Sequence, residues 1–143
     1  MLEKAMILAA KAHMGHLDKG GNPYILHPVR VMLGCKTIEE KIVAMLHDTL
    51  EDSDLTADDL IIEGFPKVIV DAVVCLTRKT DQDYMEYVHK VAKNPLATAV
   101  KLSDLADNMD LNRLPGLTPR DFQRLERYLR AKQFLENVQQ NIL

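Results

Sequence analysis

Four residues from three separate segments have the side chains of a mixed nitrogen and oxygen metal site. They are His27, the adjacent pair His47-Asp48, and Asp104. Two imidazoles and two carboxylates suit Mn²⁺, Fe²⁺ or Zn²⁺ better than a thiolate site would. An ion held in this way acidifies a bound water and polarises a phosphoryl oxygen. The set therefore indicates hydrolysis of a phosphorylated compound.

Two further acids follow the histidine–aspartate pair at helical spacing. Glu51 lies four residues after His47, and Asp52 lies four after Asp48. On a continuous helix each pair would lie on successive turns. Either carboxylate could then orient the attacking water or take its proton. The alternative is a solvated acidic face, because these residues lie opposite the apolar stripe of the same helix, and that helix alone favours this alternative.

Other polar residues give weaker signals. Arg120, Arg124 and Arg127 recur at helical spacing near the C-terminus. We expect this stripe to be a solvated face rather than a phosphate clamp, since charged helix faces are usually exposed. Three more histidines have no partner pattern and are left unassigned: His13, His16 and His89.

The segments that carry these residues are all predicted to be helices. Apolar periodicity, capping residues and prolines place helices over 2–17, from Pro28 to near Gly34, over 38–53, from Thr56, from Pro66, over 84–92, over 95–111 and from Thr118. Thr37 and Glu40 have the spacing of a capping box. Only VIVDAVVCL (68–76) has strand-like content, and its length and flanks favour a helix. We predict a single all-α domain spanning 1–143, with about seven to eight helices.

Composition narrows the class of protein. The chain has 143 residues, 47% hydrophobic and 27% charged, which predicts a folded protein with a substantial core. A net charge of −3 predicts binding neither to nucleic acid nor to anionic membranes. No apolar run reaches the roughly 20 residues of a membrane span. Cys35 and Cys75 form no CxxC pattern, so we expect free thiols and a cytoplasmic location.

Three segments together resemble a known enzyme family. HPVRV (27–31), HDTLED (47–52) and KLSDLADN (101–108) resemble the HD phosphohydrolase superfamily, whose metal ligands follow the order H…HD…D. The resemblance is closer to the hydrolase domain of RelA/SpoT proteins and to the stand-alone small alarmone hydrolases. KGGNPYILHP (19–28), MLHDTLEDS (45–53) and AVKLSDLADNM (99–109) carry it, and it extends over about residues 1–135.

The resemblance implies a reaction and a set of roles. The reaction is removal of the 3′-pyrophosphate from (p)ppGpp, giving GDP or GTP, usually with Mn²⁺. The implied metal ligands are His27, His47, Asp48 and Asp104, and the implied residues that activate water are Glu51 and Asp52. Contacts with the nucleotide are expected from Lys19, Tyr24, Lys101, Asn108 and Tyr128. Because no synthetase or regulatory domain follows in the sequence, we expect an enzyme of the stand-alone type.

Three positions depart from the family pattern. Asp18 and Leu105 stand where the family commonly has arginine, and Asp107 stands where histidine is frequent. We expect fewer cations around the nucleotide, which leaves an adenine alarmone or an ordinary nucleoside phosphate as an alternative substrate. A non-catalytic binding module is a third hypothesis, and the intact ligand set argues against it. The partner expected is a small nucleotide, and the oligomeric state stays open.

Overall fold

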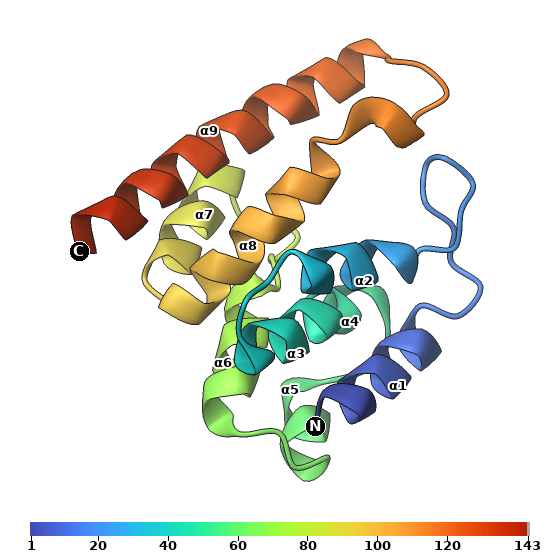
Figure 1. Ribbon diagram of the computed structural model, residues 1–143, viewed down its shortest axis with the longest axis vertical. Coiled ribbons are helices and arrows are strands. Elements are labelled where there is room, and N and C mark those ends of the chain that lie inside the picture. The colour runs from blue at the N-terminus through green and yellow to red at the C-terminus, as the bar shows by residue number, and fades with distance from the viewer. Residues whose placement is uncertain (143) are drawn as a thin grey trace.

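The computed structural model describes residues 1–142 as a bundle of helices (Figure 1). Leu143 lies outside the described residues. The helices are α1 (Leu2–Ala12), α2 (Leu26–Leu33), α3 (Ile38–Leu46), α4 (Thr49–Asp52), α5 (Ala57–Ile62), α6 (Lys67–Leu76), α7 (Tyr84–Ala92), α8 (Pro95–Asn108) and α9 (Pro119–Ile142), with a 3₁₀ turn η1 (Leu111–Arg113) before α9. Over residues 1–142 the β-structure is limited to one isolated bridge between Leu17 and Pro23. The all-α prediction is confirmed, including the helix over 68–76.

Side-chain caps explain where the helices begin. Thr37 accepts a hydrogen bond from the Glu40 amide, and the Glu40 carboxylate accepts one from the Thr37 amide, so the capping box is present at α3. Thr56 forms the same motif at the start of α5. The side chains of Asp83 and Asn94 cap α7 and α8. Each cap satisfies backbone amides that have no partner within the helix, and is typically worth about 1 kcal/mol.

Helix α3 occupies the centre of the bundle. It packs against α1, α2, α6 and α8. Its residues Val43, Ala44 and Leu46 are fully buried, and Val100 and Leu105 of α8 are buried with them. Removing an aliphatic side chain of this size from water contributes about 1.5–3 kcal/mol. The apolar residues of α3 therefore fix the position of the pair His47-Asp48 at its C-terminal end.

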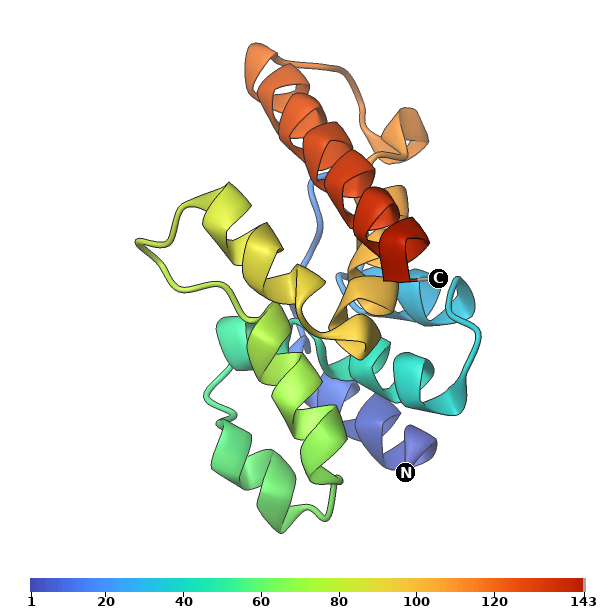
Figure 2. The same cartoon turned by 90° about the vertical axis from the view of Figure 1, so that its left-hand side faces the viewer.

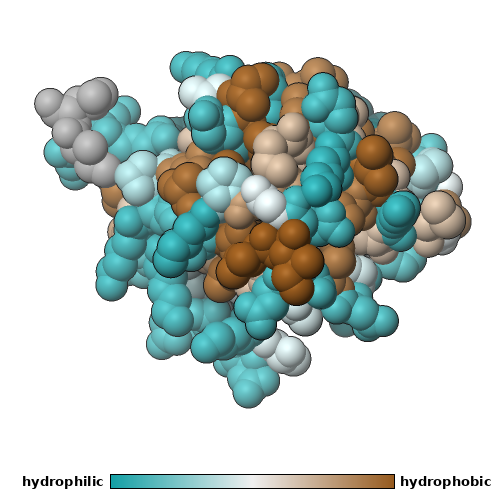
Figure 3. Space-filling model, turned by 90° about the horizontal axis from the view of Figure 1, so that it is seen from below, coloured by the Kyte–Doolittle hydropathy of each residue, from teal (hydrophilic) through white to brown (hydrophobic). Residues whose placement is uncertain are grey.

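Helix α9 lies along the outer side of α7 and α8 (Figures 1 and 2). Seen from below, the opposite end of the molecule shows apolar groups scattered among polar ones (Figure 3).

Among residues 1–142 no helix combines the length and the apolar character that crossing a bilayer needs. Cys35 is buried, Cys75 is half-buried, and both are free thiols as expected.

Two predicted helices differ most from the observed ones, and a third, expected over 95–111, ends at Asn108. The helix expected over 2–17 ends at Ala12, and Gly15 follows with a φ of 81°, a left-handed conformation that glycine adopts at little cost. The helix expected over 38–53 is interrupted at His47 and Asp48, and resumes as the single turn α4. Both differences arise next to polar residues that turn toward the interior.

Helices α2 and α8 approach each other closely at Gly34. A Cβ atom at this position would lie 2.4 Å from Ser103 Oγ. The Ser103 hydroxyl donates a hydrogen bond of 2.7 Å to the carbonyl oxygen of Val31. This contact joins the helices that carry His27 and Asp104.

Candidate metal centre and cleft

The interruption between α3 and α4 brings His47 and Asp48 to the same place. His47 is the C-cap residue that follows α3, and Asp48 precedes α4 with φ −103° and ψ −2°. This backbone conformation lies between the helical and extended regions, where many active-site residues are found. His47 is only 3% exposed. The solvated-face alternative is therefore wrong for His47, because the ring at the end of α3 is buried among the neighbouring helices.

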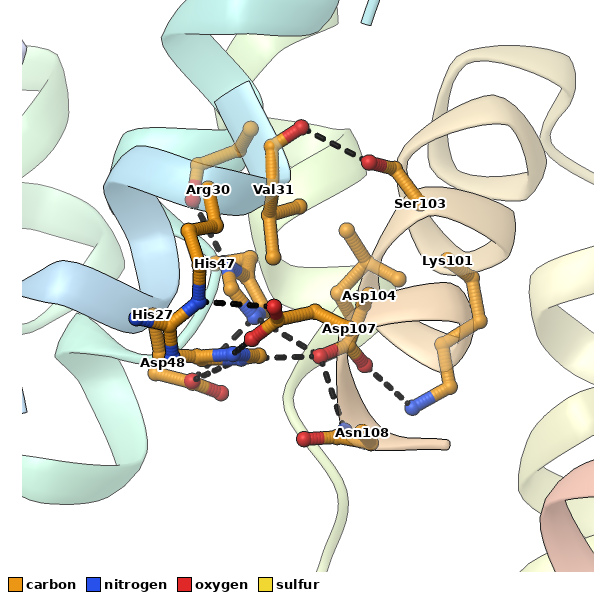
Figure 4. Close-up of polar contacts among 12 residues, drawn as sticks. His27, Arg30, Val31, His47, Asp48, Lys101, Ser103, Asp104, Asp107 and Asn108 are labelled. Atoms are coloured by element: carbon orange, nitrogen blue, oxygen red, sulfur yellow. Dashed lines mark hydrogen bonds and ion pairs between the residues drawn. The ribbon is translucent and has the colours of Figure 1, made fainter. Parts of the chain in front are cut away.

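The four candidate ligands converge, as Figure 4 shows for His27 on α2, the α3–α4 junction and α8. His27 Nε2 lies 2.9 Å from Asp104 Oδ1 and 3.6 Å from Asp48 Oδ2. His47 Nε2 lies 3.4 Å and 3.1 Å from the same two oxygens. His27, His47 and Asp104 each offer an atom within 4.8 Å of the others. Residues 77 positions apart in the sequence thus surround one point.

Both imidazoles are oriented from their outer nitrogen. His27 Nδ1 donates to Asp107 Oδ2 at 2.7 Å, and His47 Nδ1 donates to the Ala44 carbonyl oxygen at 2.6 Å. With Nδ1 protonated, the Nε2 lone pair of each neutral ring faces the carboxylates of Asp48 and Asp104. His47 Nε2 is buried and makes no hydrogen bond. Ligating histidines are held in this way, so these residues fit a metal ion.

Charges in the cluster stabilise one another. Burial disfavours protonation of His27 and His47, but the carboxylates of Asp104 and Asp107 beside His27, and the negative charges of Asp48 and Asp104 beside His47, outweigh it and raise the pKa of both rings. Burial likewise opposes ionisation of Asp48 and Asp104, yet the nearby cations lower the pKa of both carboxyls. Without a metal, shared protons on the imidazoles balance the carboxylates. A divalent cation would replace those protons.

Lys101 and Asn108 hold Asp104 from the side opposite His27. Lys101 Nζ lies 2.8 Å from Asp104 Oδ2, and Asn108 Nδ2 donates to Asp104 Oδ1 at 3.1 Å. Lys101 is only 7% exposed. Both residues line the cleft as expected for substrate contacts. Their closest polar partner in the structure is nevertheless the Asp104 carboxylate.

The two expected tyrosines lie at different depths of the cleft. The Tyr24 hydroxyl donates to Asp48 Oδ2, which orients that carboxylate. Tyr128 on α9 lines the cleft, and its ring centroid is 6.2 Å from that of Tyr84. Tyr24 is thus hydrogen-bonded to a candidate ligand, whereas Tyr128 belongs to the outer wall of the cleft.

The adjacent acids Glu51 and Asp52 point to different neighbours. Glu51 lines the cleft, and its carboxylate accepts a hydrogen bond from the Arg78 amide. Burial raises the pKa of the Glu51 carboxyl, and the charges of Asp48 and Asp52 add to the effect. Asp52 does not line the cleft among the described residues, and lies 3.9 Å from His13 Nδ1. Of these two acids, only Glu51 lies in the wall of the cleft.

A cleft of about 460 Å³ opens above the four candidate ligands. Its described walls carry many cationic side chains: Lys19, Arg30, Arg78, Lys101, Arg113, Arg124 and Arg127. The expectation of a solvated arginine face agrees with the exposure of Arg120 and Arg127, whereas Arg124 is half-buried, and both Arg124 and Arg127 line the cleft. Helix α9 packs over α7 and α8 and turns those two side chains toward the cleft, whereas Arg120 is exposed outside it. Sequence spacing placed the arginines on one helix face but contained no information on what that face covers.

The three departures from the family pattern have different structural consequences. Leu105 is fully buried in the core and does not line the cleft. Asp107 orients His27 and also accepts from Arg30 Nε at 2.7 Å. Asp18 accepts hydrogen bonds from the amides of Gly20 and Asn22, which shapes the loop at the rim of the cleft. The roles of Asp107 and Arg30 were not predicted from the sequence.

Comparisons with known proteins give a consistent group of relatives. The chain is 33% identical over 120 residues to the guanosine-3′,5′-bis(diphosphate) 3′-pyrophosphohydrolase of Aquifex aeolicus, covering 76% of this chain and 17% of that protein. It is 29% identical over 126 residues to a GTP pyrophosphokinase of Myxococcus xanthus, again 76% and 17%. With the bifunctional (p)ppGpp synthase/hydrolase SpoT of Escherichia coli the identity is 28% over 144 residues, covering 88% and 20%. The chain thus spans about a fifth of the length of these relatives.

Structural comparison supports the same fold. A solved structure described as "A metazoan ortholog of SpoT hydrolyzes ppGpp and plays a role in starvation responses" has a TM-score of 0.75, covers 99% of this chain and 96% of its own, and is 19% identical. No family model matches the chain.

Proposed function

We propose that this chain, a hydrolase domain of the RelA/SpoT type, removes the 3′-pyrophosphate of guanosine-3′,5′-bis(diphosphate) and its triphosphate analogue. The observation that carries the proposal is the convergence of His27 Nε2, His47 Nε2 and the carboxylates of Asp48 and Asp104 beneath a cation-lined cleft. The names of the bacterial relatives support this choice of substrate.

We assign His27, His47, Asp48 and Asp104 as the residues that would hold a divalent metal. Two imidazole nitrogens and two carboxylates suit Mn²⁺, which is the ion we propose. When bound, the ion would activate water and polarise the phosphoryl group. Asp107, the Ala44 carbonyl and Tyr24 keep the ligand atoms directed inward. Lys101 and Asn108 fix the carboxylate of Asp104.

Glu51 is the residue we assign as the general base. Its carboxylate lines the cleft and is oriented by the Arg78 amide. Because its pKa is raised above the ordinary value, the carboxylate accepts a proton more readily than an unperturbed glutamate would. Asp52 contributes negative charge behind Glu51 and Asp48. Lys19, Tyr128 and the remaining cations of the cleft are the proposed contacts of the nucleotide.

One observation favours a different nucleotide as the second candidate substrate. Asp18 adds a carboxylate to the cleft wall where the family commonly has arginine. A carboxylate there accepts hydrogen bonds instead of donating them, which alters recognition of the base or ribose. An adenine alarmone or an ordinary nucleoside phosphate is the alternative on this ground.

A nucleotide panel tests both candidates. The protein is incubated with Mn²⁺ and with ppGpp, pppGpp, the 3′-pyrophosphorylated adenine analogue or ordinary nucleoside triphosphates, and released pyrophosphate and phosphate are measured separately. Pyrophosphate released from ppGpp supports the first candidate. Release from the adenine analogue or from simple nucleotides alone supports the second. No release from any member, with metal binding demonstrated, would favour a binding module.

A further inference from the structure

Two arginines flank a single tyrosine ring on the α7 side of the cleft. The Cζ atom of Arg127 lies 4.9 Å from the centroid of the Tyr84 ring, and that of Arg78 lies 5.3 Å from it. The face of an aromatic ring attracts cations through its quadrupole. Tyr84 is only 7% exposed, so both guanidinium groups lie against a fixed surface.

These two arginines differ from the others around the cleft in lacking an acidic partner. Among residues 1–142 no carboxylate lies within ion-pair distance of either guanidinium. Arg78 donates from Nε and Nη2 to the carbonyl oxygen of Gln82, at 3.1 Å and 2.9 Å. Four other cations of the cleft have carboxylate partners: Arg30, Lys101, Arg113 and Arg124.

The two guanidinium charges have no negative counter-charge among the described residues. Two like charges beside one ring repel each other, and an anion between them removes that cost. The Tyr84 hydroxyl is buried and has no hydrogen-bond partner in the described structure. A buried hydroxyl left without a partner costs free energy, so an acceptor for it is expected. A phosphoryl group supplies both the negative charge and the acceptor oxygens.

The position of the cluster relates it to the metal centre. Lys101 Nζ lies 5.8 Å from the Tyr84 centroid and 2.8 Å from Asp104 Oδ2. The Arg78 amide is hydrogen-bonded to Glu51. In Figure 1, α7 lies on one side of α8 and the loop that carries Lys19 lies on the other. The cluster is therefore beside the reaction centre and separate from the Lys19 loop.

We propose that Arg78, Tyr84 and Arg127 form a binding site for a phosphoryl group of the nucleotide other than the one attacked. The guanidinium forks match phosphate oxygens in geometry and charge. The identity of the nucleotide rests on the proposed function, whereas the site's preference for a phosphoryl anion rests on these three side chains alone.

Binding of anions without metal tests this site independently of turnover. Inorganic pyrophosphate and GDP are titrated by calorimetry into the wild-type chain and into Arg127→Gln, Arg78→Gln and Tyr84→Phe, all in EDTA. Arg120→Gln is the matched control, since Arg120 lies on the same helix but outside the cleft. Far-ultraviolet circular dichroism verifies that each variant is folded.

We expect both arginine variants to weaken binding of at least one of the two anions by about tenfold or more, and Tyr84→Phe by a smaller factor. The anion affected identifies which end of the nucleotide the site holds. Equal affinities in Arg127→Gln and Arg120→Gln, or no binding of either anion to the wild type, would overturn the site. If the wild-type chain binds the anions as expected but does not hydrolyse ppGpp, only the proposed function would be overturned.

Discussion

Asp107 holds His27 from behind. Its Oδ2 lies 2.7 Å from His27 Nδ1, while Oδ1 accepts from Arg30 Nε at 2.7 Å and Arg113 Nη2 lies 3.3 Å from Oδ2. The imidazole can turn only by breaking a hydrogen bond to a carboxylate that two arginines hold in place. Its Nε2 therefore stays directed at Asp104.

Replacing Asp107 with Asn should weaken metal binding without removing a proposed ligand. The amide is a poorer acceptor for the imidazole and releases Arg30, so we expect about a 10–100-fold loss of Mn²⁺ affinity. Calorimetric titration of the metal-free protein measures it. Asp110→Asn is the control, because Asp110 also pairs with Arg113 but does not contact His27. Equal affinity in the two variants would show that Asp107 does not orient the site.

Asp48→Asn should abolish metal-dependent turnover at saturating Mn²⁺. The change removes one proposed ligand charge and leaves the volume unchanged. Because the lowered pKa of Asp48 shows that its ionised form is favoured in the folded chain, the metal-free variant should also melt at a lower temperature. Asp54→Asn, an exposed acid on the same segment, should change neither quantity. Full activity in Asp48→Asn would place the chemistry elsewhere.

Glu51→Gln should lower turnover by about 10²–10⁴-fold at saturating metal, the usual contribution of a general base. Metal content should stay near that of the wild type, because Glu51 is not one of the four residues proposed to hold the ion. Asp52→Asn, one residue further on and outside the cleft, should have a smaller effect on turnover. The assignment of Glu51 fails if the two variants lose activity equally or if Asp52→Asn loses more.

Metal binding should release protons and strengthen as the pH rises. The pKa values of His27 and His47 are raised in the metal-free chain, so both rings keep their protons to higher pH than a free histidine does. A metal must displace those protons, so its apparent affinity increases between about pH 6 and pH 8. Calorimetry in buffers of different ionisation enthalpy counts the protons released. An affinity that does not vary with pH would mean that the imidazoles do not bind the ion.

The sequence was sufficient for the features that depend on local pattern. Apolar periodicity and the box formed by Thr37 and Glu40 predicted α3 and its first residue correctly. The interruption after Leu46 was missed, because polar residues at helical spacing also fit an unbroken helix with a wet face. His47 itself keeps helical dihedral angles, and the chain departs from the helix only at Asp48, with φ −103° and ψ −2°.

The positions of the remaining site residues depend on tertiary packing, which sequence spacing does not show. Leu105 and Asp104 are neighbours in sequence, yet α8 places one in the core and the other among the candidate ligands. The side of α9 that faces the cleft depends on its packing against α7 and α8, so the place of Arg127 in the cleft wall could not be read from spacing. Asp107 lies 80 residues from His27, and no local pattern connects two residues so far apart.

The close approach at Gly34 makes the spacing of the candidate ligands depend on a contact between two uncharged residues, Gly34 and Ser103. Any side chain there meets the Ser103 hydroxyl, and rotating that hydroxyl away breaks its hydrogen bond to Val31. A substitution at Gly34 is therefore expected either to cost that hydrogen bond or to widen the spacing between α2 and α8, the helices that carry His27 and Asp104. We expect steric bulk at the back of this helix pair to change the spacing of the candidate ligands, at a position that leaves each of them and every charge among them unaltered.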